Sequence, residues 1–177
     1  MARSEETDAC CQERFSRDCW RWDARRSRAA LASGALDADK ILLAKPQTYM
    51  NLSGLAVGRL LHKYDVPVEE LIVLVDEVSL PFGRLRIRAR GSAGGHNGLK
   101  SIIGSLQNDH FIRVRMGVQP DHRVDDLTAH LLGRFRKADL ETVADMIDRA
   151  AEAARVIVQE SLQQAMNRYN PRQASPP

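Results

Sequence analysis

Five consecutive apolar residues, Leu71-Ile72-Val73-Leu74-Val75, place the strongest constraint on how this chain can fold. A short apolar run bounded by polar residues predicts a strand that is buried on both of its faces. Such a strand needs cover on both sides, and the segments around it alternate between strand-like and helix-like patterns. We therefore expect a single α/β domain in which helices flank a mixed, twisted sheet.

The remaining elements are predicted from periodicity and from the residues that begin or end them. The expected strands are 41–44, 71–75, 84–90 and 111–118, and the expected helices are 52–64, 99–106 and a long amphipathic C-terminal helix over 140–165. Asn51, Ser53 and Asn97 are suited to cap the first two helices, and Ser33-Gly34 followed by Asp37 and Asp39 predicts a turn.

Residues 1–28 differ in composition from the rest of the chain, because no Leu, Ile or Val occurs before Leu31. Such a segment cannot supply a buried central strand. We expect 1–28 to be a divergent, poorly ordered segment, 29–170 to be the domain, and 171–177 to be a disordered tail.

Composition excludes several classes of protein. Lys and Arg number 26 against 23 Asp and Glu, which favours a local basic patch over a uniformly basic surface. The only cysteines are Cys10, Cys11 and Cys19, which predicts neither a disulfide framework nor a zinc site. No apolar run of about 18 residues is present, so no membrane span is expected.

Three polar positions fall where the predicted sheet would bind a ligand. Asp76 follows a core strand, and a buried carboxylate there can orient a catalytic group or form a cap or salt bridge. The amides of Asn51 and Asn97 can hold a substrate carbonyl or cap a helix. His96, which follows two glycines, can act as a base or hold the loop by a backbone hydrogen bond.

The stretch Arg84-Leu85-Arg86-Ile87-Arg88-Ala89-Arg90 alternates strictly, so a strand there would place four arginines on one face. Like charges side by side repel unless solvent or a polyanion offsets them. The face therefore predicts contact with an RNA backbone, which Lys100, Arg113 and Arg115 would extend. The alternative is an edge strand whose charges prevent aggregation.

Several motifs occur in order between about Leu31 and Asn170: Lys45 to Gly54, Asp76-Glu77, Leu80-Pro81 with Gly83, Gly94 to Leu99, Arg113-x-Arg115-x-Gly117, Leu132 to Phe135 and Ala165 to Arg168. Taken together, these motifs resemble the bacterial-type peptidyl-tRNA hydrolase family. The resemblance implies hydrolysis of the ester between a peptide and the 3′ ribose of tRNA, with no metal or cofactor. It also implies a monomer in the cytoplasm, with a mitochondrion or chloroplast as alternatives.

The resemblance carries roles to individual residues. It implies that Asp76, Asn51 and Asn97 are catalytic, and that Tyr49 and Met50 join the asparagines in binding substrate. It implies tRNA phosphate contacts for Arg88 and Arg115, and the arginine pattern adds Arg86, Lys100 and Arg113 to the expected phosphate-binding residues.

The chain departs from this family at its start. The family opens with a core strand, a glycine-asparagine-proline-glycine turn and a segment that carries a general-base histidine, whereas the first histidine here is His62. Val75 replaces a usual histidine, and Ser79 replaces a usual aspartate. Weak hydrolysis is therefore expected of this chain, because loss of a general base costs about 10²- to 10⁴-fold in rate. The alternatives are a catalytically silent RNA-binding homologue, such as an organellar intron-splicing factor, and a chain that does not fold stably by itself.

Overall fold

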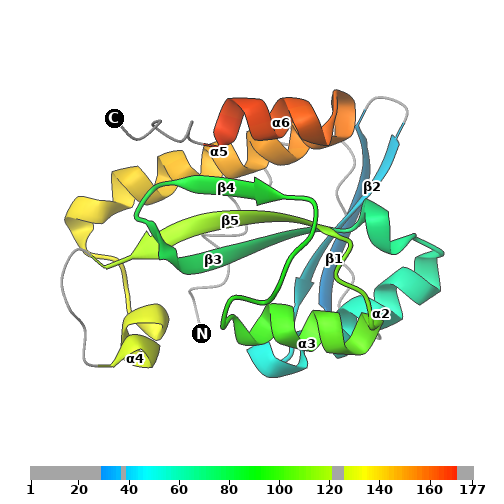
Figure 1. The fold of residues 1–177 in the computed structure, drawn as a ribbon, viewed down its shortest axis with the longest axis horizontal. Helices are drawn as coiled ribbons and strands as arrows, with labels where there is room; N and C mark the ends of the chain where they lie inside the picture. The colour runs from blue at the N-terminus through cyan, green and yellow to red at the C-terminus, as the bar shows by residue number, and fades with distance from the viewer. Residues whose placement is uncertain (1–28, 37–38, 121–125, 171–177) are drawn as a thin grey trace.

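The part of the chain that the structure describes contains two β-sheets, with helices on both sides of the larger one (Figure 1). The structure is a computed structural model, and it describes residues 29–36, 39–120 and 126–170. The expectations for residues 1–28 and 171–177, including the family's opening strand and the three cysteines, lie outside the described residues. The described part confirms the predicted α/β class with a mixed sheet and a long C-terminal helix.

The smaller sheet is an antiparallel pair of strands, β1 (Ala29–Leu36) and β2 (Asp39–Pro46). The start of the predicted turn is wrong, since Ser33 and Gly34 lie within β1 and pair with Leu42 and Ile41. The longer strand lets Leu31 and Leu42 pack in one cluster with Leu60 of α2 (Ser53–Tyr64). Burial of these leucines therefore outweighs the local turn tendency of Ser-Gly.

Among the described residues, the larger sheet has three strands in the order β3 (Ile72–Pro81), β5 (Ile112–Gln119) and β4 (Leu85–Arg88). β3 runs parallel to β5, and β4 runs antiparallel to it, so the sheet is mixed. Leu85 and Ile87 are buried while Arg86 and Arg88 are exposed, as the alternation predicted. Arg84 and Arg90 lie outside β4, so the strand itself carries two arginines and not four.

The apolar run that suggested a fully buried strand is only partly buried. Val75 is buried, but the side chain of Leu74 is 46% exposed. Within the described residues β3 is bonded to a neighbour on one side only, by β5, and the β1–β2 pair forms a separate sheet. An edge strand loses the cover that a central strand has, which explains the exposure of Leu74.

Helices cover the two faces of the larger sheet (Figure 1). α2 and α3 (Asn97–Leu106) pack on one face, in a cluster that includes Val57, Val75, Leu99, Ile102 and Phe111. α5 (Leu140–Gln159) and α6 (Leu162–Tyr169) pack on the other face, in a cluster that includes Leu85, Ile87, Val114, Met146 and Ala165. The shorter elements are η1 (Met50–Leu52), η2 (Val68–Glu70), α4 (Leu127–Leu132) and η3 (Lys137–Asp139).

The predicted long C-terminal helix is divided in two. α5 ends at Gln159, and Ser161 adopts an extended backbone before α6 begins at Leu162. The Ser161 hydroxyl accepts a hydrogen bond from the backbone N–H of Gln164 at 3.2 Å. A serine that caps a new helix satisfies its free N–H groups, so the break is stable although the apolar periodicity continues through it.

Candidate active site

Asp76 lies where the regular pairing of β3 with β5 ends. Asp76 and Glu77 pair with Met116 and Gly117, and the register then shifts before Pro81. A Cβ on Gly117 would lie 2.0 Å from the carbonyl oxygen of Pro81, so only glycine lets β3 pass this close. Strand β3 therefore continues past Asp76, and an irregularity replaces the strand end that the sequence predicted.

The carboxylate of Asp76 is joined to the imidazole of His96, the residue before α3. Asp76 Oδ1 lies 3.2 Å from Nε2 of His96. The side chain of His96 is 14% exposed and that of Asp76 is 40% exposed, so the carboxylate is the more accessible partner. The hydrogen bond from His96 holds the pKa of Asp76 below its ordinary value, although partial burial acts in the opposite direction.

The other ring nitrogen of His96 caps helix α3. The backbone N–H of Leu99 donates to Nδ1 of His96 at 3.1 Å. The prediction that Asn97 caps this helix is therefore wrong, because Asn97 is its first residue and is exposed. Its amide is left to interact with a substrate.

Asn51 does not cap α2 either. Asn51 lies in η1, the N-cap residue of α2 is Leu52, and the hydroxyl of Ser53 donates to the carbonyl oxygen of Met50 at 2.9 Å. The side chains around Asn51 face solvent, since Tyr49 is 82% exposed and Met50 is 55% exposed. The segment that carries the predicted substrate-binding residues is thus accessible.

Two glycines bring this segment against α3. A Cβ on Gly54 would lie 2.1 Å from the backbone oxygen of Ser101, and the N–H of Gly54 donates to the Ser101 hydroxyl at 3.0 Å. A Cβ on Gly98 would lie 2.6 Å from the sulfur of Met50. The close crossing of α2 and α3 therefore places η1 beside the start of α3, and so assembles Asn51 and Asn97 from two separate motifs.

A buried ion pair fastens the loop that leads to His96. Arg115 Nη1 bonds Glu77 Oε2 at 2.5 Å, and Arg115 Nη2 donates to the carbonyl oxygen of Ser92 at 2.9 Å. Burial raises the pKa of Glu77, but hydrogen bonds from Ser79 and the charge of Arg115 outweigh it, so the pKa lies below its ordinary value. Arg115 thus holds the Ser92 loop as part of the protein's own structure.

Arg113 corrects the predicted arginine face. Its side chain is fully buried, and its guanidinium donates to the carbonyl oxygens of Gly91, Ser92 and Asp109. The guanidinium also lies 4.2 Å from the ring centroid of Phe111. Alternation correctly placed Arg113 on the face shared with Arg88, but the loop covers that part of the face, so Arg113 is structural and cannot reach a phosphate.

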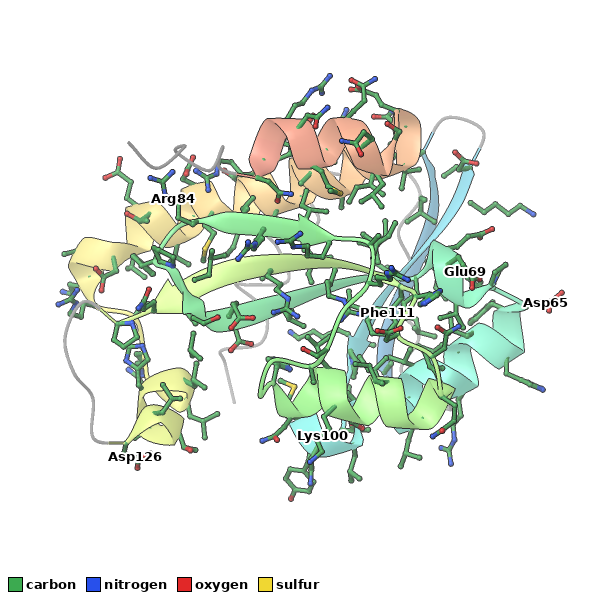
Figure 2. The ribbon with its side chains drawn as sticks, viewed as in Figure 1. Asp65, Glu69, Arg84, Lys100, Phe111 and Asp126 are labelled. Atoms are coloured by element: carbon green, nitrogen blue, oxygen red, sulfur yellow. The ribbon has the colours of Figure 1, made fainter. Side chains whose placement is uncertain are left out.

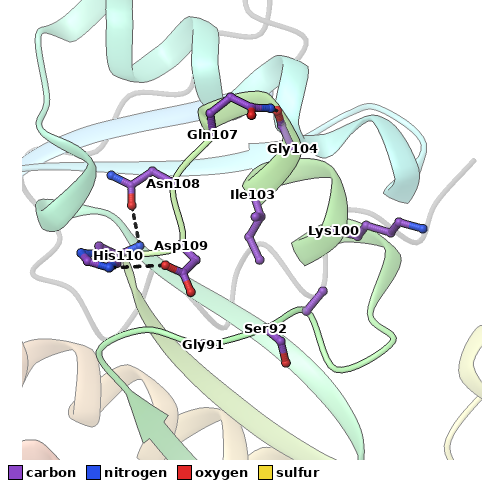
Figure 3. A pocket seen from close by; sticks show the side chains of 10 residues that line it. Gly91, Ser92, Lys100, Ile103, Gly104, Gln107, Asn108, Asp109 and His110 are labelled. Carbon is purple, nitrogen blue, oxygen red and sulfur yellow. Dashed lines mark hydrogen bonds and ion pairs between the residues drawn. The ribbon is translucent and has the colours of Figure 1, made fainter.

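Of the five basic residues expected to bind phosphate, Arg86, Arg88 and Lys100 are exposed. Figure 2 shows Arg84 beside α5 and Lys100 on α3, well separated from each other, so Arg84 does not join a basic surface around α3. Lys100 borders an open hollow of about 660 Å³ (Figure 3). Its other lining residues are Gly91 to Ala93, Ile103, Gly104 and Gln107 to His110.

Sequence reasoning missed two structural relations in this site. The pairing of His96 with Asp76 joins residues 20 positions apart, and the Glu77–Arg115 pair joins β3 to β5. The signal for the second pair lies in the parallel register of the two strands. That register sets Arg115 beside Val75, and Glu77 lies on the same face of β3 as Val75 because the two are two residues apart. No cluster of three or more metal-ligating side chains occurs in the described ranges, and no described helix is long and apolar enough to cross a membrane.

The fold is a mixed-sheet α/β domain, and its site brings the Asp76–His96 pair close to the side-chain amides of Asn51 and Asn97. This combination is suited to hydrolysis of an ester or amide. A family model described as Peptidyl-tRNA hydrolase matches residues 8–177. The chain belongs to this family of ester hydrolases, as the motifs predicted.

Individual relatives agree with the family match. The peptidyl-tRNA hydrolase of Koribacter versatilis is 42% identical over 154 residues, which cover 86% of this chain and 76% of that protein. The Chloroflexus aurantiacus protein of the same name is 46% identical over 149 residues, covering 83% and 79%. The crystal structure of peptidyl-tRNA hydrolase from Acinetobacter baumannii is similar with a TM-score of 0.78 at 27% identity, covering 85% of this chain and 77% of that one.

Proposed function

We propose that this chain hydrolyses the ester bond between a peptide and the 3′ ribose of tRNA, and so recycles stalled peptidyl-tRNA. Its relatives carry the name of that activity, and the chain presents the groups that the reaction needs. The observation that carries the proposal is the accessible carboxylate of Asp76. His96 holds this carboxylate beside Asn51 of η1 and Asn97 of α3, neither of which caps a helix.

In the proposed reaction a water molecule attacks the ester carbonyl carbon. The second oxygen of Asp76 accepts a hydrogen bond from that water and takes its proton as the new bond forms. The bond to the 3′ oxygen of the ribose then breaks, and this oxygen leaves with the proton. The amides of Asn51 and Asn97 donate to the peptide and to the carbonyl oxygen on which negative charge develops.

The exposed side chains of η1 and its neighbour bind the peptide end of the substrate. Tyr49 and Met50 offer an aromatic ring and a flexible thioether, which contact peptides of varied sequence without a fixed partner. Because Met50 also touches the start of α3 near Gly98, a peptide that lies on Met50 is brought towards Asn97.

We propose that Arg86, Arg88 and Lys100 bind tRNA phosphates. Arg86 and Arg88 lie opposite Arg115 and Arg113 across β4 and β5, so arginines of two neighbouring strands share one face of the sheet. A polyanion on this face would relieve the repulsion of like charges on neighbouring strands. The phosphate role that the resemblance implied for Arg115 becomes a positioning role, because Glu77 and Ser92 already occupy its donors.

The tRNA surface is tested by measuring the dissociation constant of a tRNA across a series of salt concentrations. Arg88→Ala should weaken binding and reduce the slope of log K against log salt by about one. Arg84→Ala removes the same charge from the same segment but from the side near α5, so its curve should follow the wild type. Equal effects of the two substitutions would reject this surface.

A catalytically silent, RNA-binding role is the second candidate. Among the described residues, the histidine that contacts Asp76 is His96, and both of its ring nitrogens already have partners. Salt-dependent tRNA binding without ester hydrolysis above the spontaneous rate would favour this role. We further propose that the chain acts as a monomer in the cytoplasm, or else in a mitochondrion or chloroplast, which gel filtration and cell fractionation would test.

A further inference from the structure

We propose that His96 is a positioning residue that binds one oxygen of Asp76 and turns the other oxygen towards the attacking water, a role that rests on the proposed function. His96 is the more buried partner of the pair, and Asp76 keeps an accessible surface. The imidazole therefore acts on the reaction through Asp76, without contacting the substrate.

The two hydrogen bonds of His96 determine where its proton lies. A backbone N–H can only donate, so Nδ1 must accept from Leu99 and cannot carry a hydrogen. In the neutral ring the hydrogen is then on Nε2, which donates it to Oδ1 of Asp76. No ring nitrogen is left to take a proton from water, so His96 cannot serve as the general base in this arrangement.

The surroundings of the ring keep this orientation. A Cβ on Gly98 would lie 2.9 Å from Cε1 and 3.2 Å from Nδ1 of His96, so the helix backbone closes over the ring edge. The loop before His96 is fastened by Arg115 through Ser92, and Arg115 is in turn paired with Glu77. The charged groups around Asp76 are thus His96 from the start of α3 and the Glu77–Arg115 pair from β3 and β5.

The Leu99 contact separates the two tasks of His96 in an experiment. In His96→Asn the side-chain oxygen can still accept from Leu99, since asparagine is a good N-cap, but the shorter side chain no longer reaches Asp76. In His96→Ala both bonds are lost. His110→Asn is the matched control, because His110 also lies beside an aspartate, Asp109, on the exposed surface.

The measurements are made on the purified chain. We expect ¹⁵N NMR of the wild type to show His96 with hydrogen on Nε2. We expect ¹³C NMR to show a higher pKa for Asp76 in His96→Asn than in the wild type or in His110→Asn. His96→Asn should keep its tRNA affinity and most of its Tm, while kcat falls by about 10- to 100-fold. His96→Ala should also lower the Tm, by about 2 to 4 °C.

Several results would overturn the positioning role: hydrogen on Nδ1 of His96, or an Asp76 pKa and a kcat that His96→Asn leaves unchanged. A wild-type chain that gives the expected NMR results but no hydrolysis rejects the hydrolase function and upholds the geometry of the pair. A wild-type chain that hydrolyses substrate, with an Asp76 pKa unaffected by His96→Asn, rejects the positioning role and upholds the function.

Discussion

Gly54→Ala tests whether the close crossing of α2 and α3 assembles the site. The new Cβ would lie 2.1 Å from the oxygen of Ser101, 2.6 Å from its carbonyl carbon and 2.8 Å from the Cβ of Ser105. Two of these three atoms belong to the backbone of α3, which cannot turn aside as the end of a flexible side chain would. The helices must therefore separate, and the Gly54–Ser101 hydrogen bond of 3.0 Å must lengthen.

The expected cost follows from three contributions. Overpacking costs about 1 to 3 kcal/mol. Loss of the hydrogen bond costs about 0.5 to 1.5 kcal/mol. Alanine recovers about 0.5 to 1 kcal/mol relative to glycine within a helix. The free energy of unfolding should thus fall by about 0.5 to 4 kcal/mol, which lowers the Tm by roughly 1 to 16 °C in a domain of this size.

Gly104→Ala provides the control within α3. No atom lies within 4 Å of a Cβ on Gly104, so helix propensity alone acts and the Tm should rise slightly. Thermal melts of the two variants are compared with hydrolysis rates at a temperature where both are folded. Gly54→Ala should lose activity as well as stability, because η1 moves away from the start of α3. A Gly54→Ala variant as stable and as active as Gly104→Ala would refute this account of the site.

Three further predictions concern polar side chains that bond within the fold. Arg113→Met should lower the Tm by several degrees, because loop carbonyls lose a charged donor, and should leave the salt slope of tRNA binding unchanged; both are read from melts and titrations. Asn170→Ala should cost about 1 to 3 kcal/mol of unfolding free energy in denaturant titrations without changing kcat, because its amide bonds both the N–H and the carbonyl of Ile87. The pKa values of Glu77 and Asp76 lie below their ordinary values, so the stability that the two carboxylates contribute is present above about pH 4.5 and is lost as the pH falls. Glu77→Gln should therefore flatten the dependence of Tm on pH below about pH 4.5.

The sequence identified the elements of the larger sheet because their patterns reflect one or two covered faces. Leu85 and Ile87 alternate with exposed arginines, and this needs no knowledge of distant residues. The same alternation could not separate Arg88, which faces solvent, from Arg113, which faces a loop. Periodicity shows which side of a strand a residue occupies, whereas cover depends on segments that fold over it.

The candidate site shows the same limit. Asp76, Asn51 and Asn97 could be selected from local patterns, but their partners depend on tertiary contacts. Asparagine is a common helix cap, yet His96 caps α3, because the imidazole also bonds Asp76 and so gains two interactions at once. The partial exposure of Leu74 likewise depends on which strands lie beside β3 and not on its own run of residues.

The most direct test of the account is the rate at which the purified chain and its Asp76→Asn variant release the peptide from an N-acylated aminoacyl-tRNA. We predict hydrolysis by the wild type that exceeds the spontaneous rate, although about 10²- to 10⁴-fold slower than that of a relative with a general-base histidine. The Asp76→Asn variant should bind tRNA as tightly as the wild type. It should release the peptide from the N-acylated aminoacyl-tRNA only at the spontaneous rate. Equal hydrolysis by the two proteins would contradict the central role of Asp76.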